Sequence, residues 1–523
     1  IQVVAHEMGH QFGAKHTFNS CGNYSELAPG SSVEPGSGTT IMGYAGTYTI
    51  CNPNEYVKDS TTEFADPYFH AKSLAEIEDY IQSTSCGSET STGNTPTIAN
   101  AGSNYNIPKS TPFVLTALDS VSNHPNDTYC WEQMNPEVVG VPLSSTNTGG
   151  PAFRSFPPTN SPRRVFPIID SILYNDNIAK WEVLPSVARN LNFRLTVRDH
   201  LPFGCSSHDD MVVTIAGNSG PFEVSYPNTH VSWPALSQQV VTWSVANTTA
   251  APVNCTDVDI LLSVDGGYTF PYVLASSTYN NGVQSVLVPN VPTESARIKV
   301  RSKGNIFFDI SNSNFTITGV PLSDAFITVW KTNNPGTSAN NRITIPGTGN
   351  NYTILWEEVG NPGNNGTTIG NNTTTVTFPS AGTYRVSILP GSGSFHRISF
   401  NNGGDRRKLL TIEQWGTIAW STMANAFYGC ENLNITSTDL PNLSGVTSMY
   451  YMFGHCLNLN GPANIGNWNT GSVTNMEYMF FDADAFNQPI GNWNTASVTT
   501  MESMFVFAGS FNQPIGNWNV SNV

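Results

Sequence analysis

The sequence is poor in charged residues and has no long apolar run. Only 11% of its 523 residues are charged, whereas globular proteins average about 25%. No run of 18 apolar residues occurs, so we expect no membrane-spanning helix. The 22 basic and 38 acidic residues give a net charge of −16 at pH 7. Because nucleic-acid phosphates and anionic membrane surfaces repel such a charge, neither is an expected partner.

The eight cysteines are widely spaced, and none forms a Cys-x-x-Cys pair. This excludes a zinc ribbon or a thioredoxin-type motif, and isolated cysteines favour an oxidising, extracellular environment. Cys130 and Cys205 belong to one predicted β module, and we expect a disulfide between them. Cys430 and Cys456 share one column of the repeats described below and are expected to be free, buried thiols. The pairing of the other cysteines stays open: Cys21, Cys51, Cys86 and Cys255.

The chain is rich in glycine (44), proline (34) and short apolar runs. Its length predicts three or four domains at roughly 150 residues each, and 39% hydrophobic residues suffice to form their cores. The expected fold class is multidomain and mainly β. The predicted parts are a truncated α+β block, three β-sandwich modules and a leucine-rich-type solenoid: 1–90, 97–217, 218–318, 319–408 and 409–523.

Local patterns predict individual elements within these parts. Asp66 as N-cap and Pro67 in the first turn predict a helix that runs through Ile81. The run Asp265-Gly266-Gly267 predicts a hairpin turn. Short apolar runs between turn residues predict strands at 113–118, 193–197, 211–215 and 240–243.

The sequence repeats itself from about residue 409. Phe427, Phe453, Phe480 and Phe505 follow one another at intervals of 26, 27 and 25 residues. Apolar columns with a period of 20–29 residues are typical of leucine-rich-type solenoids, in which each coil buries its apolar face against its neighbours. A stripe of Met and Trp side chains at this spacing favours a core position over a ligand groove.

The strongest chemical motif is HEMGHQFGAKH at residues 6–16. His6 and His10 lie four apart on a predicted helix, so they share a face and can bind one Zn²⁺ through their imidazoles. Gly13 lets the chain leave the helix with an unusual φ, and the turn brings back His16 as a third ligand. Three protein ligands leave the fourth position open to water, as a catalytic zinc requires. Glu7 can accept a proton from that water as general base.

These residues match the pattern HExxHxxGxxH at every defining position, and the block resembles the metzincin zinc metallopeptidases. It is most similar to reprolysin-like members of bacterial secreted proteins, while Thr17-Phe18 and Cys21 also resemble pappalysin-like members. The resemblance implies a Met-turn beneath the metal, for which Met42 is the match. It also places Tyr44 near the metal. Two roles stay open for this residue: its hydroxyl assists the oxyanion, or it is an ordinary packed tyrosine of the loop.

The remaining modules also resemble known families. Residues 97–217 and 319–408 are similar to PKD-like β domains, and 218–318 to Ig-like or fibronectin-like domains. The repeats, with Met-x-x-Met-Phe motifs, closely resemble BspA-type leucine-rich repeats of bacterial surface proteins.

Calcium is a second candidate metal, because carboxylates on β-sandwich loops often bind it. The spacing fits no defined calcium loop, which favours solvated turn residues. The carboxylates concerned are Asp119, Asp127, Asp209 and Asp210.

Two functions follow as hypotheses. The first is a secreted or cell-surface bacterial zinc endopeptidase that cleaves protein or peptide substrates, with its repeats binding a host or matrix surface. The second is a surface adhesin that carries a vestigial protease block. The intact ligands, Glu7 and Met42 favour the first. The metzincin resemblance covers only the C-terminal part of a catalytic domain, so we expect a fragment that is poorly active alone.

Overall fold

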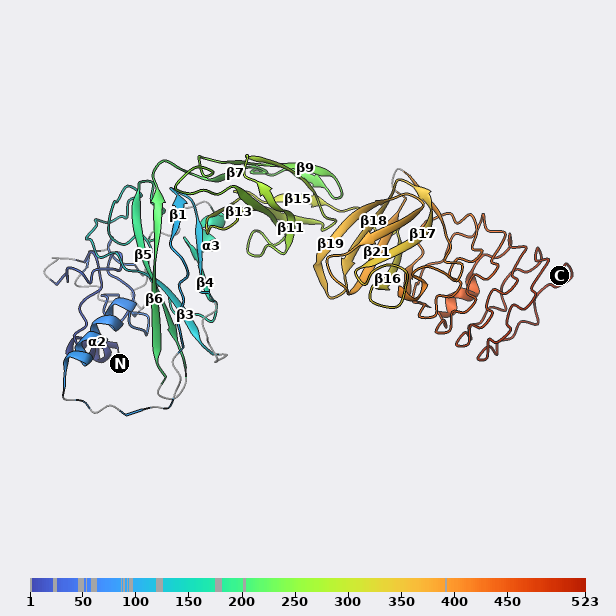
Figure 1. Ribbon diagram of the computed structural model, residues 1–523, viewed down its shortest axis with the longest axis horizontal. Helices are drawn as coiled ribbons and strands as arrows, with labels where there is room; N and C mark the ends of the chain where they lie inside the picture. The colour runs from blue at the N-terminus through green and yellow to red at the C-terminus, as the bar shows by residue number, and fades with distance from the viewer. Residues whose placement is uncertain are drawn as a thin grey trace. The chain divides into compact units, whose positions relative to one another are not determined.

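The computed structural model divides into two compact units, residues 1–318 and 319–523 (Figure 1). The described chain is mostly β, with few helices and several separate sheets. None of the helices in it is long and apolar enough to cross a membrane. The described residues are 2–21, 26–45, 51–52, 54–57, 64–85, 87, 90–91, 93, 97–118, 126–174, 181–200, 204–390 and 393–523.

The N-terminal block contains helix α1 (Gln2–Gln11), a set of loops and helix α2 (Ala71–Ser83). Helix α2 begins later than the predicted N-cap at Asp66. The Asp66 N–H donates to Thr39 O at 2.7 Å, which ties this segment to a neighbouring loop. His70 caps the helix instead, because its ring accepts a hydrogen bond from Lys72 N at 3.0 Å.

The first β module follows as a four-stranded sheet in the order β1-β6-β5-β3, with β2 and β4 paired separately. The strands predicted at 113–118, 193–197 and 211–215 are present as β2, β5 and β6. Their alternate apolar residues form the core of the module. The elements are β1 (Tyr105–Pro108), β2 (Phe113–Thr116), β3 (Thr128–Gln133), β4 (Arg163–Phe166), α3 (Ile169–Tyr174), β5 (Arg189–Arg198) and β6 (Ser206–Ala216).

The predicted disulfide between Cys130 and Cys205 is wrong, because both are free thiols. Cys130 lies on β3 opposite Thr196 of β5, and Cys205 directly precedes β6 on the far side of β5. Two strand spacings separate β3 from β6, about 9.4–9.8 Å. A disulfide needs Cα atoms within about 4.4–6.8 Å. Burial raises the pKa of the Cys130 thiol well above its usual value, so it stays protonated.

The second β module pairs a six-stranded sheet with a three-stranded one. The first has the order β11-β10-β13-β15-β8 with β14 on β13, and the second is β12-β9-β7. The predicted hairpin is present between β10 and β11, with Gly266 and Gly267 at positive φ, but its second strand begins at Tyr272. The strands are β7 (Glu223–Tyr226), β8 (Ser232–Pro234), β9 (Gln238–Ser244), β10 (Asp257–Ser263), β11 (Tyr272–Tyr279), β12 (Val283–Leu287), β13 (Thr293–Ser302), β14 (Phe308–Ile310) and β15 (Phe315–Thr318).

The second unit contains a six-stranded sheet, β19-β18-β21-β16-β23-β24, and a three-stranded sheet, β20-β17-β22. Strand β23 lies beyond the predicted boundary at residue 408, yet it pairs with β16. One hydrophobic core therefore runs from the third β module into the repeats. The strands are β16 (Phe326–Lys331), β17 (Arg342–Asn350), β18 (Tyr352–Glu358), β19 (Asn361–Gly370), β20 (Thr373–Thr377), β21 (Thr383–Leu389), β22 (Ser394–Ile398), β23 (Leu409–Gln414) and β24 (Asn434–Ile435).

Successive repeats are joined by hydrogen bonds at matching positions. Phe427 N donates to Met452 O, Phe453 N to Met479 O and Phe480 N to Met504 O, each at 2.9 Å. The phenylalanine rings of this column stack at 5.7–5.8 Å. The prediction that Cys430 and Cys456 are free and buried is confirmed, and both are 0% exposed.

Replacing Phe453 with alanine should lower the free energy of unfolding by about 3–5 kcal/mol, because its fully buried ring lies between Phe427 and Phe480. Phe507→Ala is the matched control, since that ring is 70% exposed and its loss should cost less than about 0.5 kcal/mol. Urea unfolding followed by tryptophan fluorescence measures both. Equal losses in the two variants would show that the column is assigned wrongly.

Candidate metal centre

Helix α1 and the turn after it carry the three histidines. His6, Glu7 and His10 lie on the helix, and the Glu7 side chain is exposed. The helix ends at Gln11, and Gly13 has a φ of 88°, the positive value that the sequence predicted there. A Cβ at Gly13 would also lie 2.9 Å from the Cβ of Tyr80. The reversal at this glycine brings His16 back to the helix.

The three imidazoles converge on one point. The Nε2 atom of His16 lies 3.3 Å from that of His6 and 3.1 Å from that of His10. Ligand nitrogens about 2.0–2.1 Å from a tetrahedral zinc are about 3.3–3.4 Å apart, so the spacing suits one ion. Among the described residues, this is the only group of three or more His, Cys, Asp or Glu side chains placed to hold a metal.

Each ring is turned by a hydrogen bond at its other nitrogen. The Nδ1 atoms of His6, His10 and His16 lie 2.7, 2.8 and 3.1 Å from the carbonyl oxygens of Ile41, Ala14 and Glu26. A carbonyl only accepts, so each Nδ1 must donate and each neutral ring presents a lone pair at Nε2. Three Nε2 lone pairs that face one another with no hydrogen-bond donor between them repel one another unless a cation lies at their centre. Hydrogen bonds from Nδ1 to a backbone carbonyl are typical of metal-binding histidines.

Burial lowers the pKa of His16, and the neighbouring His10 and His6 lower it further. The effect favours the neutral imidazole, which is the form that binds a metal.

Met42 lies beneath helix α1. Its side chain is 0% exposed and belongs to a small apolar cluster with Ala14 and Ile41. A Cβ at Gly9, between His6 and His10, would come within 2.5 Å of the Met42 sulfur. Only glycine therefore permits this close approach of the helix to the methionine.

Tyr44 lies beside the histidines and is half-buried. Its ring centroid is 4.7 Å from that of His16 and 4.6 Å from that of Phe18, and its hydroxyl donates to the Glu26 carboxylate. Burial, and then this carboxylate, raise the pKa of Tyr44, so the phenol remains a hydrogen-bond donor. A disulfide between Cys21 and Cys51 packs in the cluster that Tyr44 adjoins. Cys86 lies outside the described residues.

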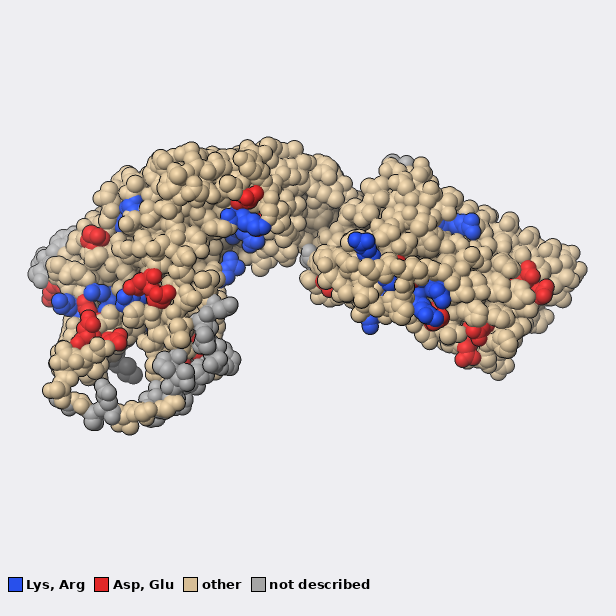
Figure 2. All heavy atoms as spheres, viewed as in Figure 1, with Lys and Arg blue, Asp and Glu red and all other residues tan. Residues whose placement is uncertain are grey.

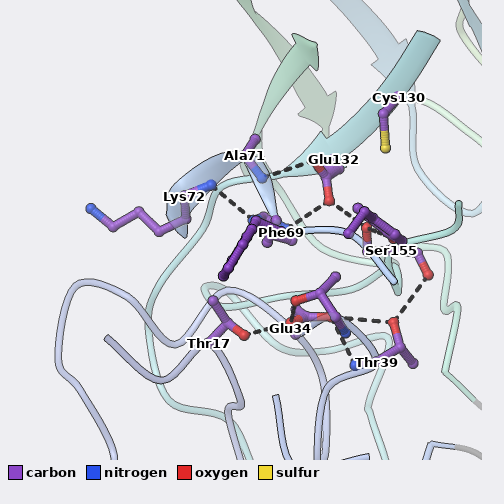
Figure 3. Close-up of polar contacts among 12 residues, drawn as sticks. Thr17, Glu34, Thr39, Phe69, Ala71, Lys72, Cys130, Glu132 and Ser155 are labelled. Carbon is purple, nitrogen blue, oxygen red and sulfur yellow. Dashed lines mark hydrogen bonds and ion pairs between the residues drawn. The ribbon is translucent and has the colours of Figure 1, made fainter. Parts of the chain in front are cut away.

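A buried carboxylate that sequence patterns did not reveal holds the loops beneath the site. Glu34 is 1% exposed and accepts from the hydroxyls of Thr17, Thr39 and Thr40 at 2.5–3.2 Å (Figure 3). It also accepts from the N–H groups of Thr39 and Thr40 at 2.8 and 3.1 Å. Thr17 follows His16, and Thr40 lies two residues before Met42. Glu34 therefore joins the segment after His16 to the segment before Met42.

A second buried carboxylate, Glu132 on β3, joins the first β module to the same block. It is 0% exposed and accepts from Ala71 N at 2.9 Å and from Ser155 Oγ at 2.5 Å (Figure 3). His70 Nε2 lies 3.6 Å from it. The carboxylate thus sits at the N-terminus of α2, where the helix dipole favours negative charge. Ile77 of α2 packs against the Met42 cluster, so the β module supports the base of the metal site.

No calcium cluster is present among the described carboxylates. Asp210 is engaged by Arg194 at 2.7 Å, and Asp209 accepts from Ala101 N at 2.8 Å. Asp127 is buried and joins no metal-binding group within the described chain. Asp119 lies outside the described residues.

Residues 1–66 match the model of the reprolysin-like metallopeptidases of family M12B. Residues 421–523 match a family described as a Mycoplasma protein of unknown function, DUF285. The first match supports a metallopeptidase fold for the N-terminal block. No curated protein matches the chain.

Solved structures that match the chain include fibronectin domains, immunoglobulin domains and a glucan-utilization protein. The chicken CNTN1 FN1–FN3 domains are 10% identical, over 58% of this chain and 97% of that one. Sidekick-1 immunoglobulin domains 1–5 are 9% identical, over 56% and 54%. The Bacteroides ovatus SGBP-B protein in complex with a mixed-linkage heptasaccharide is 7% identical, over 57% and 100%. The TM-score is 0.13 in each case, too low to support a conclusion about function.

Replacing His10 with alanine should weaken zinc binding more than about 100-fold. Loss of a group that only hydrogen-bonds a metal ligand usually weakens binding by about 10–100-fold, and loss of the ligand itself should cost more. His230→Ala is the control, because that exposed histidine lies in the second β module. Titration against a competing chelator measures both affinities. Unchanged affinity in His10→Ala would contradict the assigned ligand set.

Replacing Glu132 with alanine should lower the free energy of unfolding by about 3–5 kcal/mol, because it leaves Ala71 N–H, Ser155 and His70 buried without their partner. Zinc affinity should fall as well. Asp210→Ala removes an exposed ion pair from the same sheet and should cost about 1 kcal/mol or less. Urea unfolding compares the two variants, and a loss in Glu132→Ala no larger than the control would refute the coupling.

Proposed function

We propose that the chain is a zinc-dependent endopeptidase that hydrolyses peptide bonds in protein substrates. The observation that carries the proposal is the convergence of three Nε2 lone pairs, each set by an Nδ1 hydrogen bond to the backbone. The family match over residues 1–66 supports the same class of activity. His6, His10 and His16 would hold the metal.

Residues of the chain would transfer the proton and stabilise the reacting substrate. Zinc, when bound, lowers the pKa of a coordinated water toward about 7 and polarises a carbonyl. Glu7, exposed beside His6, accepts the proton of the attacking water on its carboxylate and passes it to the leaving amine nitrogen. The Tyr44 hydroxyl, which donates to Glu26 in the structure and is kept protonated by its surroundings, would donate to the developing oxyanion after releasing that carboxylate. Met42 and Gly9 hold the ligand-bearing helix in place.

The β modules and repeats would attach the enzyme to its substrate or to a surface. The stacked hydrogen bonds between repeats support a leucine-rich-type solenoid of the BspA kind. A disulfide and the family match favour a secreted or cell-surface bacterial protein. A host or matrix surface is the proposed ligand of the repeats.

The second candidate function is a surface adhesin with a vestigial protease block. The observation in its favour is that β modules and repeats make up most of the chain, from residue 97 to residue 523. The complete set of His6, His10, His16, Glu7 and Met42 favours the enzyme, because decay would remove a ligand or the base.

Replacing Glu7 with glutamine should leave zinc binding intact and reduce peptide cleavage by about 10²–10⁴-fold, the usual contribution of a general base. Glu78→Gln on α2 is the matched control, since that glutamate is also exposed on a helix. Zinc content is measured by mass spectrometry and cleavage with a mixed library of fluorogenic peptides.

The result separates the two functions. Cleavage that depends on both zinc and Glu7 supports the endopeptidase. A wild-type chain that binds zinc but cleaves no peptide above the level of Glu7→Gln would overturn it in favour of the adhesin.

A further inference from the structure

A pocket of 370 Å³ lies where the first β module meets the second, within the first unit. The two modules are joined there by hydrogen bonds from Val114 N to Ile306 O and from Phe308 N to Pro112 O, each at 3.0 Å. Four of the chain's 22 basic residues line this one pocket. They are Arg163, Lys299, Arg301 and Lys303.

The cations come from an alternating pattern on β13. Ala296, Ile298 and Val300 are 0% exposed and face the core, so the residues between them face the opposite side of the sheet. Lys299 and Arg301 occupy that side at the pocket, and Arg163 faces them from β4. Figure 2 shows Lys and Arg side chains gathered in the region where Figure 1 places β13.

The pocket has too little negative charge to balance its cations. Asp259 is its one acidic lining residue, and Arg301 binds it at 2.9 and 3.1 Å. Asp259 also accepts from Ser277 N at 2.9 Å. The ammonium group of Lys303 donates to the Ser277 hydroxyl. Among the described residues, neither Lys299 nor Arg163 forms an ion pair with an acidic side chain.

Lys299 is buried without a counter-ion. Only 9% of the residue is exposed, and its ammonium nitrogen lies 3.5 Å from the ring centroid of Phe308 and 5.3 Å from that of Phe270. Burial, followed by Arg163 and Arg301, lowers the pKa of Lys299 to about 7. A buried lysine of this kind opposes folding. Methionine would fill the same space without that cost, so the fold itself does not explain the residue.

We propose that this pocket binds a sulfate or phosphate ester carried by a sugar. The oxyanion would lie against Lys299 and Arg163, whose charges are free, and guanidinium groups match its oxygens in geometry. The pocket is larger than an oxyanion, and Val114 and Phe308 give it apolar walls that suit a sugar ring. The net charge of −16 repels long polyanions, so the proposed ligand carries a single charged group.

The test measures binding of four probes to the full chain by isothermal titration calorimetry. The probes are a sulfated disaccharide, its desulfated counterpart, inorganic sulfate and inorganic phosphate. We expect the sulfated sugar to bind at least tenfold more tightly than the desulfated sugar, and more weakly as salt is raised. Equal binding of both sugars would overturn the proposal. Binding of inorganic phosphate above inorganic sulfate would assign the ester as a phosphate, and the reverse as a sulfate.

Variants separate binding from folding. Lys299→Met and Arg163→Ala should each weaken binding of the sulfated sugar at least tenfold, whereas Lys109→Met, which does not line the pocket, should not. Lys299→Met should also raise the melting temperature, because it removes an unpaired buried charge. A variant that melts higher and no longer binds supports the site. Unchanged binding in both pocket variants would refute it.

Discussion

The candidate metal site depends on three hydrogen bonds that orient the imidazoles. Each Nδ1 donates to a backbone carbonyl, at Ile41, Ala14 and Glu26, and this sets the lone pairs of the Nε2 atoms on one point. The three carbonyls belong to separate turns. The three imidazoles therefore converge only when all of these turns are folded. Helix α1 alone supplies the rings of His6 and His10 but does not fix their rotation. Metal binding would stabilise the same folded loops, because binding and folding are linked.

Two buried carboxylates hold those turns in place. Glu34 ties the segment after His16 to the Met-turn, and Glu132 holds the start of α2, whose Ile77 packs beneath the site. A carboxylate removed from water costs several kcal/mol unless its oxygens are fully hydrogen-bonded. Both are bonded to several donors. Because Glu132 comes from the β module, a buried hydrogen bond to Ala71 N joins the N-terminal block to the first β module, although sequence patterns predict them as separate domains.

The few charges of this chain are distributed unevenly. The net charge of −16 argues against polyanionic partners, yet β13 places lysine and arginine together on one side of its sheet. Composition averages over the whole surface, whereas binding depends on the local arrangement of charges. The unpaired Lys299 is the clearest example, because its position opposes the stability of the module that contains it.

Sequence spacing was sufficient to predict that His6, His10 and His16 lie close together, because helical periodicity and the Gly13 turn are local properties. It also predicted the stacking column of Phe453, since a repeat carries its own period. The separation of Cys130 from Cys205 and the start of α2 were decided by tertiary structure alone. Strand β5 lies between Cys130 and Cys205, and the loop of Thr39 draws Asp66 away from the helix. Both outcomes depend on which segments become neighbours in space, and local sequence does not contain that information.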